Sequence, residues 1–389
     1  MQLHQRIVIL GLSLTSSWRN GHAGAYRALV AALAARGHDV LFLERDVPAH
    51  AANRDLPAPP WGRTALYDSL EALRDQHGCA IRDADVVLVG SSVPDGIAVG
   101  RFVLETARGI RAFYDIDTPV TLHALAQGRC PYLAKDLVPR YDLYLSFAGG
   151  PTLALLERTW GAPLARQLYG AADPDTFFPE DVSREFALGY LGTYSEDRQP
   201  GLEALLLAPA RHLPQRRFAV AGPPFPDHVR WPENVERIER VRPDEHRRFH
   251  NRQLCSLSLA RADLRERGHA PSLRLFEAAA CGVPVMTDVW PGLEELFTPG
   301  AEILPVRSAS DSLRILRALR EEDRDAIGRA ARRRVLAQHT PQHRAAELDD
   351  AVALARERRA RRRGGPVRLA GGTLAERRRA RAASETHAL

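Results

Sequence analysis

Short apolar runs alternate with helical patterns along the chain. Runs at 6–13, 39–44, 85–91, 111–117 and 143–147 predict strands, and residues 25–36 predict an apolar-rich helix that ends at Gly37. The pattern restarts after residue 179, with further predicted strands at 186–192, 217–222, 235–238, 254–259 and 283–288. Strands that alternate with helices indicate parallel pairing in doubly wound sheets. The sequence therefore predicts two Rossmann-like α/β domains that face each other across a cleft, with ligands at the carboxyl ends of the strands.

The remaining segments have other patterns. Residues 45–64 contain four prolines and no clear periodicity, and a loop of that length in a compact domain is usually functional or disordered. Residues 308–359 are amphipathic with a helical period in most windows. We place the first domain at 1–170 and the second at 171–340.

Composition and charge exclude several classes of protein. With 45% hydrophobic residues in 389, the chain can bury cores, which excludes wholesale disorder. The net charge is +6, but residues 356–389 carry 11 Arg and three Glu, so residues 1–355 carry a net −2. This argues against a folded nucleic-acid reader, which needs its positive charge on a folded face. We expect the tail at 356–389 to be poorly ordered, either fully solvated or in weak contact with anionic surfaces.

The cysteines and the apolar runs point to no metal, disulfide or membrane segment. The four cysteines are scattered and lack zinc-ligand spacing, so we expect no metal and no disulfide framework. No run approaches ~18 apolar residues, and the N-terminus lacks a cleavage pattern of small residues. We therefore expect a cytoplasmic protein.

The most informative stretch predicts a short helix over residues 273–281. Ser272 is a good start and Gly282 a good stop for this helix. The free amides at its start would suit a phosphate, and Arg261 and Arg274 could add charge-assisted contacts. Ser272 could equally act only as a cap.

Glu277 lies within this helix among small apolar neighbours. A carboxylate buried in such a setting costs several kcal/mol unless it finds partners, and the hydroxyl groups of a bound ribose would supply them. The alternative is a solvent-facing glutamate, or one bonded to a neighbouring loop.

Several segments together resemble the GT-B glycosyltransferases, and more closely their CgeB-like branch. The helix region reads RLFEAAACGVPV at 274–285, followed by DVWPGLEE at 288–295 and PGAEIL at 299–304. Further segments that look familial are FYDIDTPVTL at 113–122, ADPDTFFP at 172–179 and YLGTYS at 190–195. The resemblance covers about residues 5–355.

This resemblance implies transfer of a sugar from a nucleotide-sugar donor to an unidentified acceptor held mainly by the first domain. It implies that Glu277 holds the ribose hydroxyls, with no metal or other cofactor required. It also implies that helix 341–355 crosses back onto the first domain. The residues that it places around the diphosphate and donor sugar are Ser272, Arg274, Arg261, Arg198, Gly292 and Leu293. One position departs from the pattern: where many retaining relatives have a second glutamate, this chain has His269.

The candidate catalytic residues lie in the first domain. His22, in the first strand–helix loop, is a candidate general base, or else a helix-capping or exposed histidine. Asp117, at the end of a predicted strand, suits acceptor binding or base work, or a cap of the next turn. Asp115 and Asp117 resemble a metal-binding pair, but their place in the first domain disfavours that interpretation.

Other interpretations remain open. His246 and His250 look like part of a solvated helix face. A GT-B-type sugar-nucleotide epimerase would use the same donor site without an acceptor, and a non-catalytic nucleotide-binding or assembly protein could keep the fold. A dinucleotide oxidoreductase is disfavoured because the glycine fingerprint is missing.

Overall fold

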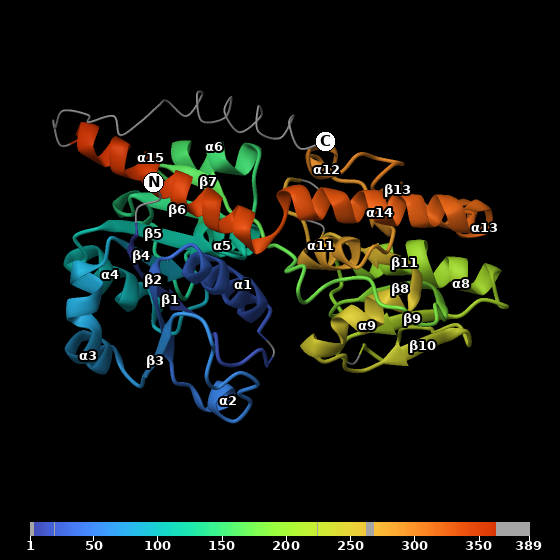
Figure 1. Ribbon diagram of the computed structural model, residues 1–389, viewed down its shortest axis with the longest axis horizontal. Coiled ribbons are helices and arrows are strands. Elements are labelled where there is room, and N and C mark those ends of the chain that lie inside the picture. Colours follow the sequence, from blue (N-terminus) through green and yellow to red (C-terminus); the bar gives the residue numbers. More distant parts are fainter. Residues whose placement is uncertain (1–3, 19, 224, 262–267, 363–389) are drawn as a thin grey trace.

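The computed structural model describes residues 4–18, 20–223, 225–261 and 268–362, which form two α/β lobes side by side (Figure 1). The strands of the first lobe are β1 (Arg6–Gly11), β2 (Asp39–Arg45), β3 (Arg63–Tyr67), β4 (Val86–Gly90), β5 (Ile110–Asp115), β6 (Leu143–Ser146) and β7 (Ala165–Gln167). They pair in parallel in the order β3-β2-β1-β4-β5-β6-β7.

The second lobe repeats this architecture. Its strands are β8 (Phe186–Leu191), β9 (Phe218–Ala221), β10 (Val235–Ile238), β11 (Gln253–Ser258), β12 (Val285–Asp288) and β13 (Leu304–Val306). They also pair in parallel, in the order β10-β9-β8-β11-β12-β13. In each sheet the order reverses next to the first strand, which is where doubly wound sheets bind ligands. The predicted pair of Rossmann-like sheets is confirmed.

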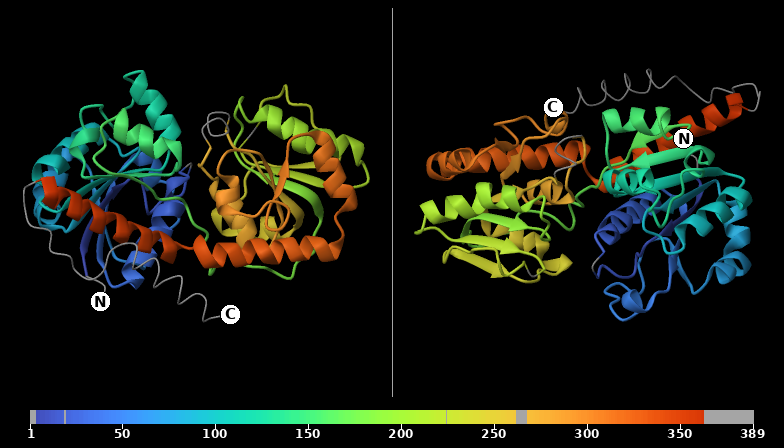
Figure 2. Two further views of the ribbon diagram at one scale, coloured as in Figure 1. Left: turned by 90° about the horizontal axis from the view of Figure 1, so that it is seen from above. Right: turned by 180° about the vertical axis from the view of Figure 1, so that it is seen from behind.

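Helices cover both faces of the first sheet (Figure 2). Alternate residues of β1 separate the two layers, because successive side chains of a strand point to opposite faces. Val8 and Leu10 pack with α3 and α4, whereas Ile7 and Ile9 pack with α1. The helices of this lobe are α1 (His22–Ala35), α2 (Pro48–Ala51), α3 (Leu70–Asp83), α4 (Gly96–Thr106), α5 (Thr118–Ala126) and α6 (Pro151–Arg158), with a 3₁₀ turn at Val138–Arg140.

The helices of the second lobe are shorter until the end of the chain. They are α7 (Gln199–Leu202), a π-helical turn (Glu203–Leu207), α8 (Ala208–His212), a 3₁₀ turn (Pro243–Glu245), α9 (His246–Asn251), α11 (Leu273–Ala280), α12 (Leu293–Leu296), α13 (Ala309–Ala318) and α14 (Glu321–Gln338). The next helix, α15 (Pro341–Arg362), leaves this lobe and crosses onto the first one (Figure 1). No helix in the described ranges is both long and apolar enough to span a membrane.

Helix α15 completes the first lobe's core. Its residues Ala345, Leu348, Val352 and Ala355 join the apolar cluster formed by α1 and the sheet. The helix extends beyond the predicted end at residue 355, so residues 356–362 are helical and not part of a disordered tail. Arginines of this last part bond to the first lobe, for example Arg356 to Gln5. The rest of the predicted tail, 363–389, lies outside the described residues.

The segment predicted as a long loop at 45–64 is partly structured. It contains α2, which begins at Pro48, a residue that suits the first turn of a helix. It ends in β3, which pairs with β2 at the sheet edge. The remainder packs on the loop after β1 through Asn53 and Asp55.

Candidate functional site

His22 and Asp117, predicted separately, lie against each other at the carboxyl ends of the first lobe's strands. His22 opens α1 after β1, and Asp117 follows β5 just before α5. His22 Nε2 lies 2.7 Å from Asp117 Oδ2. The His22 side chain is 10% exposed and that of Asp117 is 42% exposed, so the carboxylate opens toward solvent and the imidazole lies beneath. Such a pair can accept a proton on the imidazole and stabilise the resulting charge.

Charges from both lobes act on Asp117. Its burial raises the pKa, but the hydrogen bond and charge of His22, together with the charge of Arg261, hold the pKa below its usual range. Arg261 is an exposed residue that follows β11 in the second lobe. Asp117 is therefore an anion at neutral pH that faces a cation of the opposite lobe.

Asp115 is the interior neighbour of this pair. It is fully buried, and its carboxylate accepts bonds of 2.6 Å each from Tyr144 Oη and Thr121 Oγ1. Burial raises its pKa to about 6 despite these bonds. Asp115 therefore supports the strand end and does not face a ligand together with Asp117. Among the described residues no group of three or more His, Cys, Asp or Glu side chains could hold a metal.

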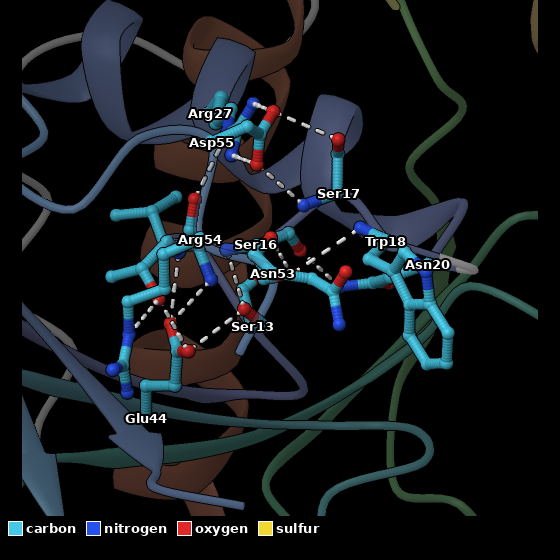
Figure 3. A network of polar contacts seen from close by, with 12 residues as sticks. Ser13, Ser16, Ser17, Trp18, Asn20, Arg27, Glu44, Asn53, Arg54 and Asp55 are labelled. Carbon is cyan, nitrogen blue, oxygen red and sulfur yellow. Dashed lines mark hydrogen bonds and ion pairs between the residues drawn. The ribbon is translucent and has the colours of Figure 1, made fainter. Parts of the chain in front are cut away.

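The loop between β1 and α1 is tied to the end of β2 (Figure 3). The amides of Leu14 and Thr15 both donate to Glu44 Oε2, at 2.7 and 2.9 Å. The amide of Ser17 donates to Asp55, which also pairs with Arg27. Side-chain carboxylates thus take amides that a dinucleotide-binding loop would offer to a pyrophosphate.

In the second lobe, Glu277 is buried in α11 with a 4% exposed side chain. Its Oε2 lies 2.5 Å from Arg274 Nη1, 3.8 Å from His250 Nε2 and 3.9 Å from His246 Nδ1. Burial raises the pKa of this carboxyl, but Arg274 and the two histidines outweigh burial and hold the pKa well below its usual range. Glu277 is an ionised carboxylate in a buried position, with Arg274 as its cationic partner.

The two histidines beside Glu277 are buried, so the prediction of a solvated helix face is wrong. Burial and the nearby Arg274 lower the pKa of His246 to about 4, and burial lowers that of His250. Both imidazoles are therefore neutral at pH 7. The error arose because α9 has only six residues, too few for a helical period to distinguish its faces.

The other predicted donor-site residues lie around the start of α11 and the nearby strand ends. Ser272 Oγ accepts the amide of Arg274 at 3.3 Å, as a helix cap does. Arg198 follows β8, and its guanidinium donates to Ser195 Oγ at 2.8 Å and to Thr193 Oγ1 at 2.7 Å. These bonds fix the direction of a cation beside the sheet's switch point.

The loop after β12 brings Gly292 and Leu293 next to His269. Gly292 has φ +89°, and an added Cβ would lie 2.3 Å from His269 Nδ1. The Leu293 amide donates to Trp290 O at 3.3 Å, so that amide is engaged within its own turn. His269 itself has φ +53°, and its carbonyl accepts the Gly149 amide of the first lobe at 2.8 Å. His269 therefore joins the two lobes directly.

The chain passes from the first lobe to the second and later returns, and the buried Arg344 bonds to both connecting passages. Arg344 Nε donates to Gly170 O at 3.2 Å, on the first passage. Its Nη2 donates to Gln338 O at 3.3 Å and lies 2.7 Å from His339 Nδ1, on the second passage. One side chain thus couples the two segments that connect the lobes.

Sequence reasoning missed Glu44, His269 as a contact between lobes, and Arg344. A signal existed for Glu44, because it ends the apolar run VLFLE at 40–44, where an acid must be either exposed or bonded. Arg344 carried no such signal, since one more arginine in an arginine-rich helix looks like a solvated residue.

Comparisons with known proteins agree with this geometry. Residues 198–350 match the family model described as glycosyl transferase-like. No curated protein matches the chain in sequence.

The solved structures that resemble the chain include glycosyltransferases and a related synthase. Sucrose-phosphate synthase from Thermosynechococcus elongatus shares 16% identity at a TM-score of 0.65, covering 90% of this chain and 99% of that one. HepE from Anabaena, solved with UDP and glucose, shares 13% identity at a TM-score of 0.66, covering 90% and 100%. An alpha-glucosyltransferase solved with UDP and a 13-mer DNA shares 14% identity at a TM-score of 0.66, also covering 90% and 100%. The chain therefore has the GT-B fold, and its residues 198–350 match the glycosyl transferase-like family.

Proposed function

We propose that the protein transfers a hexose from a nucleotide-sugar donor, held by the second lobe, to an acceptor hydroxyl in the first. The observation that carries this proposal is the buried, ionised Glu277 in the glycosyl transferase-like domain. Its three charged or polar contacts all fall on Oε2. Oε1 is the atom that we assign to the ribose hydroxyls, since a carboxylate oxygen accepts two such bonds.

The diphosphate of the donor lies, in this proposal, at the start of α11. The helix amides beyond Ser272 and the guanidinium groups of Arg274, Arg261 and Arg198 would surround it, with the backbone at Gly292 facing the sugar. Arginines pair with phosphate oxygens in a bidentate manner and stabilise the charge of a departing diphosphate. The transfer would then need no metal ion.

His22 acts as the general base in this proposal, and Asp117 orients it. The acceptor oxygen attacks the anomeric carbon as the bond from that carbon to the diphosphate oxygen breaks. The acceptor proton reaches His22 Nε2 by way of the more exposed Asp117 carboxylate, which then stabilises the imidazolium. The 2.7 Å contact between the two side chains supports transfer of the proton across it.

The UDP complexes of the alpha-glucosyltransferase and of HepE support UDP as the first nucleotide to test. The quoted motifs support a place in the CgeB-like branch, and we assign the protein to the cytoplasm. The Glu44 contacts disfavour a dinucleotide oxidoreductase, because the loop amides and the acid at the end of β2 bond to each other.

Donor binding is tested by thermal unfolding with UDP, GDP, TDP, CDP, ADP and NAD. A nucleotide at ~100 times its Kd stabilises the protein by about 2.7 kcal/mol, and we expect UDP to do so. Glu277→Gln should abolish this shift. Glu302→Gln, which removes a carboxylate paired with Arg334 in the same lobe, should retain it. An unchanged shift in Glu277→Gln would refute the ribose assignment.

Transfer itself is tested by release of UDP from UDP-hexoses with and without candidate acceptors. His22→Ala and Asp117→Asn should each lower turnover by about 100-fold, a typical contribution of a general base, while the UDP-induced shift persists. Turnover equal to that of the unmodified protein would remove both residues from the mechanism. Epimerised donor without transfer would favour the epimerase instead.

A further inference from the structure

The end of β2 holds a carboxylate whose hydrogen bonds all stay within the protein. Glu44 is fully buried. It accepts four bonds from three consecutive residues: Ser13 Oγ at 2.8 Å, the amides of Leu14 and Thr15 at 2.7 and 2.9 Å, and Thr15 Oγ1 at 2.7 Å (Figure 3). A buried anion of this kind is stable only with such a set of donors. Glu44 therefore fixes the shape of the loop that follows β1.

Asn20 links the loop to His22 through hydrogen bonds. Its Nδ2 donates to Ser13 O at 3.4 Å and to Ser16 O at 3.1 Å, and its Oδ1 accepts the His22 amide at 3.0 Å. Asn20 is itself buried, so these bonds are not exchanged with water. The chain of contacts runs from Glu44 through Ser13 and Asn20 to the first residue of α1.

A second set of bonds, centred on Asp55, holds the middle of the same loop. Asp55 accepts the Ser17 amide and hydroxyl, both at 2.8 Å, and pairs with Arg27 of α1 at 2.9 Å. Arg27 Nε also donates to Leu14 O at 2.8 Å. The loop is thus bonded to Glu44 at the end of β2, to Asp55 after α2 and to Arg27 of α1. His22 follows directly after this loop.

We propose that Glu44 is a positioning residue, which presets residues 13–18 and Asn20 so that His22 is held in register with Asp117. The proposal rests on the proposed function, in which His22 is the base. A base must be held close to its working geometry, because a displacement of about 1 Å can cost on the order of 100-fold in rate. Glu44 lies behind the loop, and it acts through Asn20 without touching a substrate.

Glu44→Gln is the primary test. The amide group has the same size, but when its oxygen accepts the amides of Leu14 and Thr15, its NH₂ meets the hydroxyls of Ser13 and Thr15. These hydroxyls now donate to Glu44 and already accept the Ser16 amide and Arg54 Nε, so the loop should loosen. We expect kcat to fall by about tenfold or more while KM for the donor and the UDP-induced thermal shift stay unchanged. Amide hydrogen exchange at 13–22 should be at least about tenfold faster than in the unmodified protein.

Asp349→Asn is the matched control. Asp349 pairs with Arg36 at 2.9 Å and His38 at 3.1 Å, so its removal also breaks ion pairs in the first lobe, but at the other end of α1. We expect normal kcat and unchanged exchange at 13–22. Asn20→Ala, which breaks the link to His22 and leaves Glu44 in place, should reproduce the kcat loss and serves if Glu44→Gln does not fold.

The outcomes separate this proposal from the proposed function. Unchanged exchange at 13–22 in Glu44→Gln, or normal kcat in both Glu44→Gln and Asn20→Ala, would overturn the positioning role. A rise in donor KM that matches the fall in kcat/KM would also overturn it, since it would mean a donor-binding role. If the unmodified protein transfers no sugar, the proposed function fails, and the exchange experiment alone decides whether Glu44 fixes the loop.

Discussion

Asp115 and Asp117 are two positions apart, yet their surroundings shift their pKa values in opposite directions. For both carboxyl groups burial raises the pKa. At Asp117 the hydrogen bond and charge of His22 outweigh it, whereas at Asp115 the neutral hydroxyls of Thr121 and Tyr144 do not. A full charge opposite a carboxylate stabilises its ionised form more than neutral donors do.

Asp115 should make the fold less stable as the pH rises. Its folded-state pKa of about 6 lies above the ordinary value of 3.8, so its contribution is fully present below pH ~4 and is lost as the pH rises through 6. The shift corresponds to a loss of up to about 3 kcal/mol. Urea unfolding at pH 4 and pH 7.5 measures this for the unmodified protein and for Asp115→Asn. The free energy of unfolding of the variant, minus that of the unmodified protein, should increase with pH, and an equal difference at both pH values would contradict this account.

The residue types of the candidate site could be read from the sequence, but their pairing could not. Asp117 ends an apolar run and His22 opens a helix, which marks both as ligand-facing positions. That they touch depends on the strand order β1-β4-β5, which brings the two strand ends near each other and leaves no trace in local periodicity. For Glu277 the small apolar neighbours indicated burial, whereas its partners His246 and His250 come from a different element.

Helix α15 packs on the first lobe, so it brings a late segment of the chain against an early one. Ala345, Leu348, Val352 and Ala355 recur at helical spacing and form the stripe that packs on the first lobe. Arg358 and Arg359 extend the contact by bonding to Pro163 O and Asp142. Charge therefore prolongs the helix beyond residue 355, the end that the resemblance implied.

Leu348→Ala should destabilise the first lobe by about 2–5 kcal/mol, the usual cost of removing a buried leucine side chain. Leu336→Ala is the control, because Leu336 is 39% exposed on α14 and its loss should cost about 0.5 kcal/mol or less. Chemical unfolding of both variants measures the difference. Equal costs would mean that α15 does not stabilise the first lobe.

Periodicity failed to predict three of the four edge strands, whereas the fourth, β10, was predicted. β3, β7 and β13 have three to five residues, and β3 is only half buried, so none forms a clear apolar run. The central strands β1, β4 and β8 were predicted because both of their faces are buried, which makes their sequences continuously apolar.

At the scale of the whole molecule, the lobes meet directly where Gly149 donates to the His269 carbonyl. Gly150 lies beside this bond with φ +52°, and an added Cβ would lie 2.4 Å from the His269 ring. How the lobes approach each other depends on contacts that no single domain's sequence specifies. The joining role of His269 was therefore beyond prediction from sequence.

Gly150→Ala should push the lobes apart and lower transfer by about tenfold or more, since misplacing two reacting halves by about 1 Å is costly. The UDP-induced thermal shift should persist, because the donor site lies within the second lobe. Gly128→Ala provides the control: Gly128 has φ +69° with open space around it, so it adds backbone strain alone. Equal turnover of the two variants would show that this contact has no part in transfer.

The return of α15 also has a consequence for how the protein is made. The ribosome releases the sheet of the first lobe and α1 early, but residues 345–355, which cover part of the same sheet face, follow only after the second lobe. Until then α1 covers only part of that apolar face. The nascent first lobe must therefore wait until the second lobe has been synthesised, and the lobe that is made first completes its core last.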